Sequence, residues 1–192
     1  MQSKVQMKEF VIRFLKDKLP PAYRYHSYEH SLYVMDKVIE IAQHENCTEK
    51  EIELLKTAAL WHDSGYVKVY KGHEEESCVL AQQYLPKYGF TPDEINKVCG
   101  MIMATKIPQS PTNKLEEIIA DADLEYLGTD DADRQAELFF KELQHLDPSL
   151  TKKEWHKVQI SFLKQHKYFT RFCREHKEPA KLKYLAELTR NS

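Results

Sequence analysis

The sequence predicts an all-α protein that folds as a single domain. Apolar residues recur at steps of three and four almost throughout the chain, which is the spacing that places them on one face of an α-helix. Only 5 of the 192 residues are glycine, and the turn-forming residues fall where helices are expected to end. A chain of this length can bury roughly 70% of its unfolded surface, so we expect one domain over residues 1–192.

The first two helices are expected before residue 45. The first carries an apolar stripe that includes Met7 and Leu15. Pro20 and Pro21 end it, because proline lacks the amide N–H and keeps the preceding residue out of the helical conformation. The second helix is expected from about Ser27 to His44.

The third helix begins at a capping box formed by Thr48 and Glu51, whose side chains bond the free N–H groups of the first turn. Gly65 is expected to end this helix in a left-handed turn. Residues 66–72 are expected to form a loop. A helix with an acidic first turn follows, and Gly89 stops it.

Thr91, Pro92 and Glu94 give the next helix a strong start signal. Another helix is expected around Leu115, closed by Gly128. Three further helices are expected in the C-terminal part: 131–146, 151 to about 176, and a short one after Pro179.

The composition excludes several classes of protein. The 28 basic and 30 acidic residues give a net charge of −2, whereas a broad nucleic-acid surface needs a basic excess. No stretch approaches the roughly 20 apolar residues of a membrane span, and the N-terminus does not resemble a secretory signal. We therefore expect a cytoplasmic protein without nucleic-acid or membrane partners. The four cysteines are far apart in sequence, which favours reduced, mostly buried thiols.

Four segments collect residues that helical cores normally exclude. They are residues 25–30 (Tyr-His-Ser-Tyr-Glu-His), 61–63 (Trp-His-Asp), 73–74 (His-Glu) and 121–123 (Asp-Ala-Asp). His30 and His62 lie on apolar helix faces, so both imidazoles are expected to point inward. A single inward histidine is more often a hydrogen-bonded core residue. Two of them, with Asp63 and Asp123 beside them, favour a metal site, since imidazole and carboxylate together suit Mn²⁺, Fe or Zn²⁺.

The ordered set of motifs resembles the HD superfamily of metal-dependent phosphohydrolases. The order is His30, then His62-Asp63, then a distant aspartate followed by leucine. The flanking motifs resemble a bacterial branch described as predicted metal-dependent HD phosphohydrolases. They include Arg-Tyr-His-x-x-x-His at residues 24–30 and Ala-Leu-Trp-His-Asp at 59–63. The resemblance implies an HD-type helical bundle, with a metal-binding core at about 22–128 and C-terminal helices 131–190 packed on it.

The resemblance implies that His30, His62, Asp63 and Asp123 hold the metal. Asp121 competes with Asp123, because both follow an alanine and residues two apart on a helix cannot face one ion. Asp123 is favoured, since apolar residues lie four and eight positions away from it. Asp121 would then be a neighbouring group or a surface charge.

Other polar residues are candidates for catalysis and substrate binding. His26 precedes His30 in a context similar to that of cyclic-nucleotide phosphodiesterases, which implies a proton donor to the leaving oxygen; capping the helix is the alternative. His73 and Glu74 are expected to reach the ion through water or to bind substrate. Lys106 stands where HD proteins with two metals have another histidine, so one metal is favoured, and its ammonium could meet a phosphate.

The implied reaction is hydrolysis of a phosphate ester or anhydride, with a nucleotide as the natural substrate. One divalent transition metal (Mn, Fe, Zn, Co or Ni, with Mg as an alternative) activates water. Asp63 binds the metal and orients the water, and His26 protonates the leaving group. The sequence leaves open the substrate, the native metal, a second metal near His73, and the oligomeric state, including a homodimer.

Three rival functions fit parts of the sequence. His26-Ser-Tyr-Glu29-His30 matches the H-x-x-E-H string of zinc peptidases, in which both histidines bind zinc and the glutamate is the base. That hypothesis leaves the His62-Asp63 motif unexplained. A di-iron oxygenase on the HD scaffold would need a further histidine, which this sequence lacks. A non-catalytic metal and nucleotide sensor differs from the phosphohydrolase only in turnover.

Overall fold

The computed structural model describes residues 3–190. Within this range the chain forms ten α-helices and three short 3-10 helices, with no strand. The helices are α1 (Lys4–Lys18), α2 (Tyr28–His44), α3 (Glu49–Trp61), α4 (His73–Tyr84), α5 (Pro92–Ala104), α6 (Lys114–Asp123), α7 (Ala132–Leu146), α8 (Lys152–Gln165), α9 (Arg171–His176) and α10 (Glu178–Arg190). The 3-10 helices are η1 (Ser64–Val67), η2 (Leu85–Tyr88) and η3 (Glu125–Gly128). The all-α prediction is confirmed, and none of the helices described is long and apolar enough to cross a membrane.

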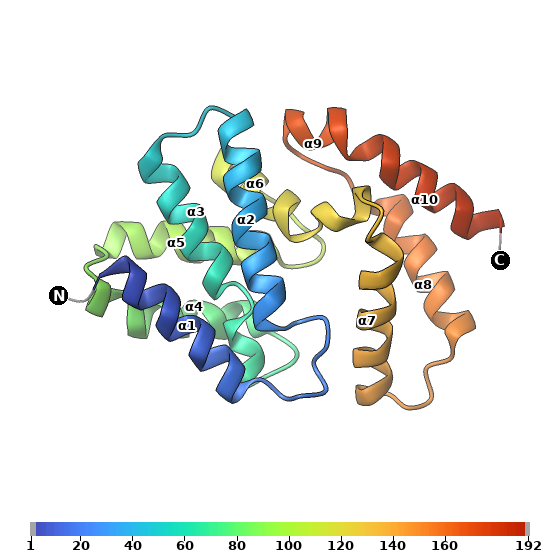
Figure 1. Ribbon diagram of the computed structural model, residues 1–192, viewed down its shortest axis with the longest axis horizontal. Coiled ribbons are helices and arrows are strands. Elements are labelled where there is room, and N and C mark those ends of the chain that lie inside the picture. The colour runs from blue at the N-terminus through green and yellow to red at the C-terminus, as the bar shows by residue number, and fades with distance from the viewer. Residues whose placement is uncertain (1–2, 191–192) are drawn as a thin grey trace.

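The helices form two groups that meet at η3 (Figure 1). Helix α2 packs against α3 and α6, and α5 packs against α3, α4 and α6. One large apolar core unites these helices with α1 and η2. A second, smaller cluster joins η3 to α7, α8 and α10, and its buried members are Tyr25, Leu124, Tyr126, Leu127 and Leu163. Helices α7, α8 and α10 therefore pack beside Tyr25 and η3. Helix α9 packs instead at the other end of α2, where the Phe172 ring stacks on His44 and the Phe172 N–H donates to Glu45.

The helix starts predicted from capping residues are present. Reciprocal capping boxes open α3, α5 and α8, formed by Thr48 with Glu51, Thr91 with Glu94, and Thr151 with Glu154. Ser27 caps α2, where the His30 N–H donates to the Ser27 hydroxyl. Each cap satisfies an amide that the helix itself leaves unbonded, which fixes where these helices begin.

Gly65 has a different role from the one predicted. Among the described glycines, positive φ occurs at Gly72 (+77°) and Gly89 (+82°) and not at Gly65. Gly65 lies in η1, and its N–H donates to the Ser77 hydroxyl of α4 at 2.7 Å. A Cβ at this position would lie 2.0 Å from the carbonyl oxygen of His73. Gly65 is therefore required by close packing of η1 against α4, and not by a left-handed turn.

Replacing Gly65 with alanine is expected to destabilise the fold by about 1–3 kcal/mol, because the new methyl group must push α4 away from η1. The matched control is Gly100→Ala on α5. There the new Cβ would meet only the flexible end of the Glu116 side chain, at 3.0 Å. Inside a helix, alanine is more stable than glycine by about 0.5–1 kcal/mol. Urea unfolding of both variants tests the prediction, and equal stabilities would contradict it.

The predicted continuous helix from 151 to about 176 is wrong. Helix α8 ends at Gln165 and α9 begins at Arg171. In the break, the N–H groups of Phe169 and Thr170 donate to the Asp121 carboxylate, each at 2.8 Å, and the Thr170 hydroxyl donates to it at 2.7 Å. A tertiary contact thus replaces the helical hydrogen bonds that these residues would otherwise make.

The prediction of mostly buried thiols is also wrong in part. All four cysteines have free thiols, but only Cys173 is buried, while Cys47, Cys78 and Cys99 are half-buried. Cys78 lies on α4 and Cys99 on α5, whereas Cys47 lies between α2 and α3, and all three pack at the edge of the large apolar core.

Candidate metal centre

His62 and Asp63 occupy the junction between α3 and η1. The His62 Nδ1 donates to the carbonyl oxygen of Ala59 at 2.8 Å, which leaves the lone pair on Nε2 pointing away from α3. The side chain is 1% exposed. Asp63 follows directly as the residue before η1, and its carboxylate lies on the same side as the His62 Nε2.

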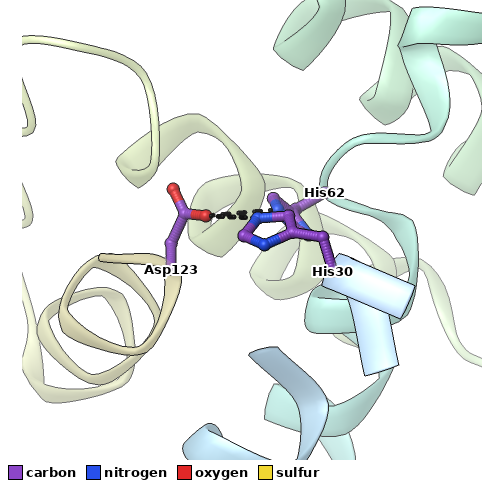
Figure 2. A group of neighbouring side chains, drawn as sticks. All are labelled: His30, His62 and Asp123. Atoms are coloured by element: carbon purple, nitrogen blue, oxygen red, sulfur yellow. Dashed lines mark hydrogen bonds and ion pairs between the residues drawn. The ribbon is translucent and has the colours of Figure 1, made fainter. Parts of the chain in front are cut away.

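His30 and Asp123 bring in two more elements. His30 lies in the first turn of α2 and Asp123 is the last residue of α6. Figure 2 shows the Asp123 carboxylate facing the two imidazoles. The Asp123 Oδ1 lies 3.0 Å from the His30 Nε2 and 3.4 Å from the His62 Nε2. The Asp63 Oδ2 lies 3.2 Å from the His62 Nε2 and 3.7 Å from the His30 Nε2. Three elements thus place two imidazoles and two carboxylates around one point.

The electrostatics of this cluster fit a bound cation. The His62 Nε2 and the Asp63 Oδ2 are buried and have no hydrogen-bond partner. Burial lowers the pKa of His62, but the Asp63 and Asp123 carboxylates outweigh it and raise that pKa well above its usual value. Burial likewise opposes ionisation of Asp123, yet the nearby His30 and His62 imidazoles lower its pKa to about 2. Both shifts in pKa have one cause, because the carboxylates favour positive charge at this point, and a divalent ion could supply that charge in place of a proton on His62.

The chain offers three donor atoms that lie within 4.8 Å of one another, one each from His30, His62 and Asp123. Asp63 lies beside them, with its Oδ2 near both imidazoles and its Oδ1 3.5 Å from the His73 Nε2. Nitrogen and oxygen donors of this kind suit first-row transition metals such as Mn²⁺, Fe²⁺ or Zn²⁺. All four predicted ligands are therefore grouped in one place.

Asp121 is turned away from this cluster. Its carboxylate is fully buried and accepts the three hydrogen bonds from Phe169 and Thr170 described above. Burial raises the pKa of Asp121 to about 6, although these donors act in the opposite direction. The spacing argument for Asp123 assumed one helix that continues to Leu127. Helix α6 ends at Asp123 and Leu127 belongs to η3, so only the apolar residues before Asp123 share its helix.

His26 lies next to the cluster and is held by Glu142, a residue that the sequence analysis did not single out. Ser27, not His26, caps α2. The His26 Nδ1 is hydrogen-bonded to the Glu142 Oε1, and the Glu142 Oε2 accepts the N–H groups of Tyr25 at 3.0 Å and of His26 at 3.1 Å. The other ring nitrogen, Nε2, lies 3.1 Å from the Tyr66 hydroxyl. The orientation of the His26 ring is thus fixed on both sides.

Glu142 comes from α7 and is completely buried. A signal for it does exist in the sequence: it follows Leu138 by four residues and Phe139 by three, so it is a carboxylate on the apolar face of an amphipathic helix. Such a group needs a partner when it is buried. The identity of that partner, 116 residues earlier, could not be deduced from local sequence.

His73 and Glu74 begin α4 and border the cluster. The His73 ring stacks on Tyr66, with ring centroids 3.8 Å apart. Burial lowers the pKa of His73, but the neighbouring Asp63 carboxylate outweighs it and raises that pKa above its usual value. Both residues line the same cavity as Asp63 and Asp123.

Lys106, a predicted substrate-binding residue, does not line the cavity. Its ammonium pairs with the exposed Glu75 on the outer side of α4. Helix α5 ends at Ala104, so the chain turns outward before Lys106, and Thr105 lines the cavity in its place.

A cavity of about 220 Å³ opens beside the metal centre. One end is polar and contains Asp63, Asp123, His26, His73 and Glu74. The other walls are aromatic and aliphatic and come mostly from η3, α7 and α8, including Phe139, Trp155 and Phe162. The site therefore lies between the helices that hold the acidic and imidazole groups and the C-terminal helices.

Comparison with known proteins identifies the family of this chain. The family model of the HD domain matches residues 27–125, just over half of the chain. A search of curated proteins finds no match. The chain belongs to the HD domain family, whose members are metal-dependent hydrolases.

Solved structures share the fold over nearly the whole chain. A predicted HD superfamily hydrolase from an uncultured Thermotogales bacterium is 22% identical, with a TM-score of 0.64 over 98% of this chain and 91% of its own. Bacillus subtilis YpgQ, crystallised in complex with ADP, is 19% identical, with a TM-score of 0.66 over 98% and 94%. The selenomethionine form of YpgQ gives a TM-score of 0.65 at 16% identity over 98% and 97%. At these identities the likeness shows the fold alone.

Proposed function

We propose that this protein is a metal-dependent phosphohydrolase that cleaves a phosphate ester or anhydride, with a nucleotide as the candidate substrate. The observation that carries the proposal is the placement of two groups along one cavity. The cluster of His30, His62, Asp63 and Asp123 offers a divalent ion its ligands, and His26 faces the same space. An ion and a separate proton donor are what the hydrolysis of a phosphate ester requires.

His30, His62, Asp63 and Asp123 would hold a divalent ion, and such an ion would supply a water whose pKa is lowered from about 15.7 towards about 7 and positive charge for a phosphate oxygen. Asp63 has one oxygen beside the two imidazoles and the other turned toward His73, so it can accept a hydrogen bond from the attacking water and orient it. His73 supports this orientation through its own contact with Asp63.

His26 is the proposed proton donor to the leaving oxygen. Glu142 accepts the Nδ1–H and also bonds two backbone amides, which holds the ring in one orientation. The proton that can be transferred is therefore the one on Nε2, next to the Tyr66 hydroxyl. Glu142 acts as a positioning residue, because it touches His26 and does not line the cavity.

A nucleotide is supported by two observations. The cavity has aromatic side chains that can stack on a base, including Phe139 and Trp155. One protein with the same fold, YpgQ, was crystallised with ADP.

The zinc peptidase hypothesis is not supported by the geometry. In an H-x-x-E-H site, His26 would be a ligand and Glu29 the base. Both ring nitrogens of His26 are engaged, by Glu142 and Tyr66, and Glu29 is exposed. The sensor hypothesis keeps the same geometry and predicts metal and nucleotide binding without turnover.

Release of inorganic phosphate or of a nucleoside product separates the enzyme from the sensor. The protein with Mn²⁺ is incubated with a panel of nucleoside mono-, di- and triphosphates, and the products are identified by chromatography. We expect hydrolysis of at least one ester, abolished by Asp63→Asn. Binding of metal and nucleotide without any product would favour the sensor and overturn the proposal.

A further inference from the structure

The cavity beside the metal centre has a composition that bears on substrate selection. None of its lining residues, all within the described part of the chain, is a lysine or arginine. Its polar end carries three carboxylates, Asp63, Glu74 and Asp123, and two imidazoles, His26 and His73. A bound phosphate can therefore find positive charge only at the metal centre and at these histidines.

Two of the lysines near α4, Lys68 and Lys106, are paired with glutamates and do not line the cavity. Lys106 bonds Glu75, and Lys68 lies 2.5 Å from Glu76. Each additional phosphoryl group on a substrate adds at least one negative charge. In this cavity such a charge would meet the Glu74 carboxylate, and no lysine or arginine lines the cavity to balance it beyond the metal centre and the two histidines. Charge that is poorly compensated away from water is unfavourable.

The remaining walls favour an apolar or aromatic group. Phe139 and Trp155 meet edge to face with ring centroids 5.5 Å apart, and Phe139 also packs on Tyr25 and His26. The rim is apolar as well, since Ile107 and Val158 line the cavity although each is 53% exposed. Exposed apolar residues grouped at a cavity mouth are typical of a binding site.

The volume limits what fits. An apolar cavity of about 150 Å³ accepts benzene, so the 220 Å³ present here can hold one ring system beside a phosphoryl group. The walls that set this limit come largely from α7 and α8, which follow the matched HD region at residues 27–125.

We infer that this cavity selects phosphate esters that carry a single phosphoryl group and an aromatic or apolar organic group, and disfavours nucleoside di- and triphosphates. The inference rests on the proposed phosphohydrolase function and narrows its substrate class. The aromatic group lies against Phe139 and Trp155, and the phosphoryl group lies at the metal centre.

The first test compares benzyl phosphate with methyl phosphate, whose leaving alcohols are of similar acidity, in the Mn²⁺-loaded protein. Burial of the phenyl ring is expected to raise kcat/KM about 10- to 100-fold. AMP is likewise expected to exceed ATP in kcat/KM. Equal values for the two esters, or a preference for ATP, would overturn the inference while leaving the phosphohydrolase function intact.

The second test adds a charge to the rim. Val158→Lys should raise the ATP-to-AMP ratio of kcat/KM about 2- to 5-fold, the range for an exposed charge pair. Val79→Lys is the matched control, because Val79 is 50% exposed on α4 and does not line the cavity. The same rise in both variants would show that the ratio follows net charge and not the cavity, which would contradict the inference.

A third measurement does not depend on turnover. Benzylphosphonate and methylphosphonate, which are not hydrolysed, are titrated into the full-length protein while tryptophan fluorescence is followed. The Trp155→Phe variant shows which part of the fluorescence change comes from Trp155. Tighter binding of benzylphosphonate supports the cavity assignment even if no ester is hydrolysed, in which case only the proposed function fails. Equal binding of the two phosphonates would contradict the assignment.

Discussion

Replacing Asp123 with alanine is expected to empty the metal centre. Asp123 lies within 3.4 Å of both imidazole nitrogens, and its loss removes a charged ligand from a small donor set. Loss of a group that merely supports a ligand costs 10- to 100-fold in metal affinity, so loss of Asp123 itself should cost more than about 100-fold. Metal content per chain after dialysis, measured by mass spectrometry, checks this, and turnover should disappear with the ion.

Asp121→Ala is the matched control, two residues away. It should keep the ion, because the Asp121 carboxylate bonds Phe169 and Thr170. It should instead lower the free energy of unfolding by about 1–3 kcal/mol, since buried N–H donors lose their acceptor. If Asp121→Ala empties the site and Asp123→Ala does not, the ligand assignment is wrong.

The second large effect is expected at His26. Replacing it with alanine should leave the metal bound and reduce turnover by about 10² to 10⁴-fold, the range for removing a general acid. The loss should shrink for p-nitrophenyl phosphate, whose leaving group needs little protonation. Kinetics with p-nitrophenyl and benzyl phosphate, together with metal analysis, measure both expectations.

Glu142→Gln tests the same step from the other side of the ring. The amide keeps the size of the side chain but removes the charge that faces Nδ1 and the backbone amides of Tyr25 and His26. Turnover should fall about 10- to 100-fold, again less for p-nitrophenyl phosphate. A purely structural role for Glu142 would lower the rates on both substrates equally.

Loss of metal with His26→Ala would contradict the proton-donor role of His26 and agree with the zinc peptidase hypothesis.

Local sequence was sufficient to predict most helices, and the order of the motifs, through their resemblance to the HD superfamily, predicted the set of candidate metal ligands. Capping residues such as Thr48 and Thr91 act on the next few amides, so their effect can be deduced from a short segment. His30 and His62 could be placed because an imidazole on an apolar face must point into the core.

The features that sequence analysis missed depend on contacts between distant segments. The break after Gln165 exists because Asp121 binds the amides of Phe169 and Thr170, 48 and 49 residues further on. Gly65 is required because η1 lies so close to α4 that a Cβ at this position would overlap the His73 carbonyl group. Glu142 reaches His26 from a helix that begins more than 100 residues later. None of these partners can be identified from spacing within one helix.

Titration of metal-free protein with Mn²⁺ while ester hydrolysis is followed tests the central claim most directly. Substrate is supplied at saturation, and the initial rate is measured against the number of Mn²⁺ ions added per chain. A single cluster of His30, His62, Asp63 and Asp123 predicts no hydrolysis without the ion and a rate that rises to a plateau at one ion per chain. Hydrolysis in the absence of metal, or no hydrolysis at any Mn²⁺ concentration, would contradict it.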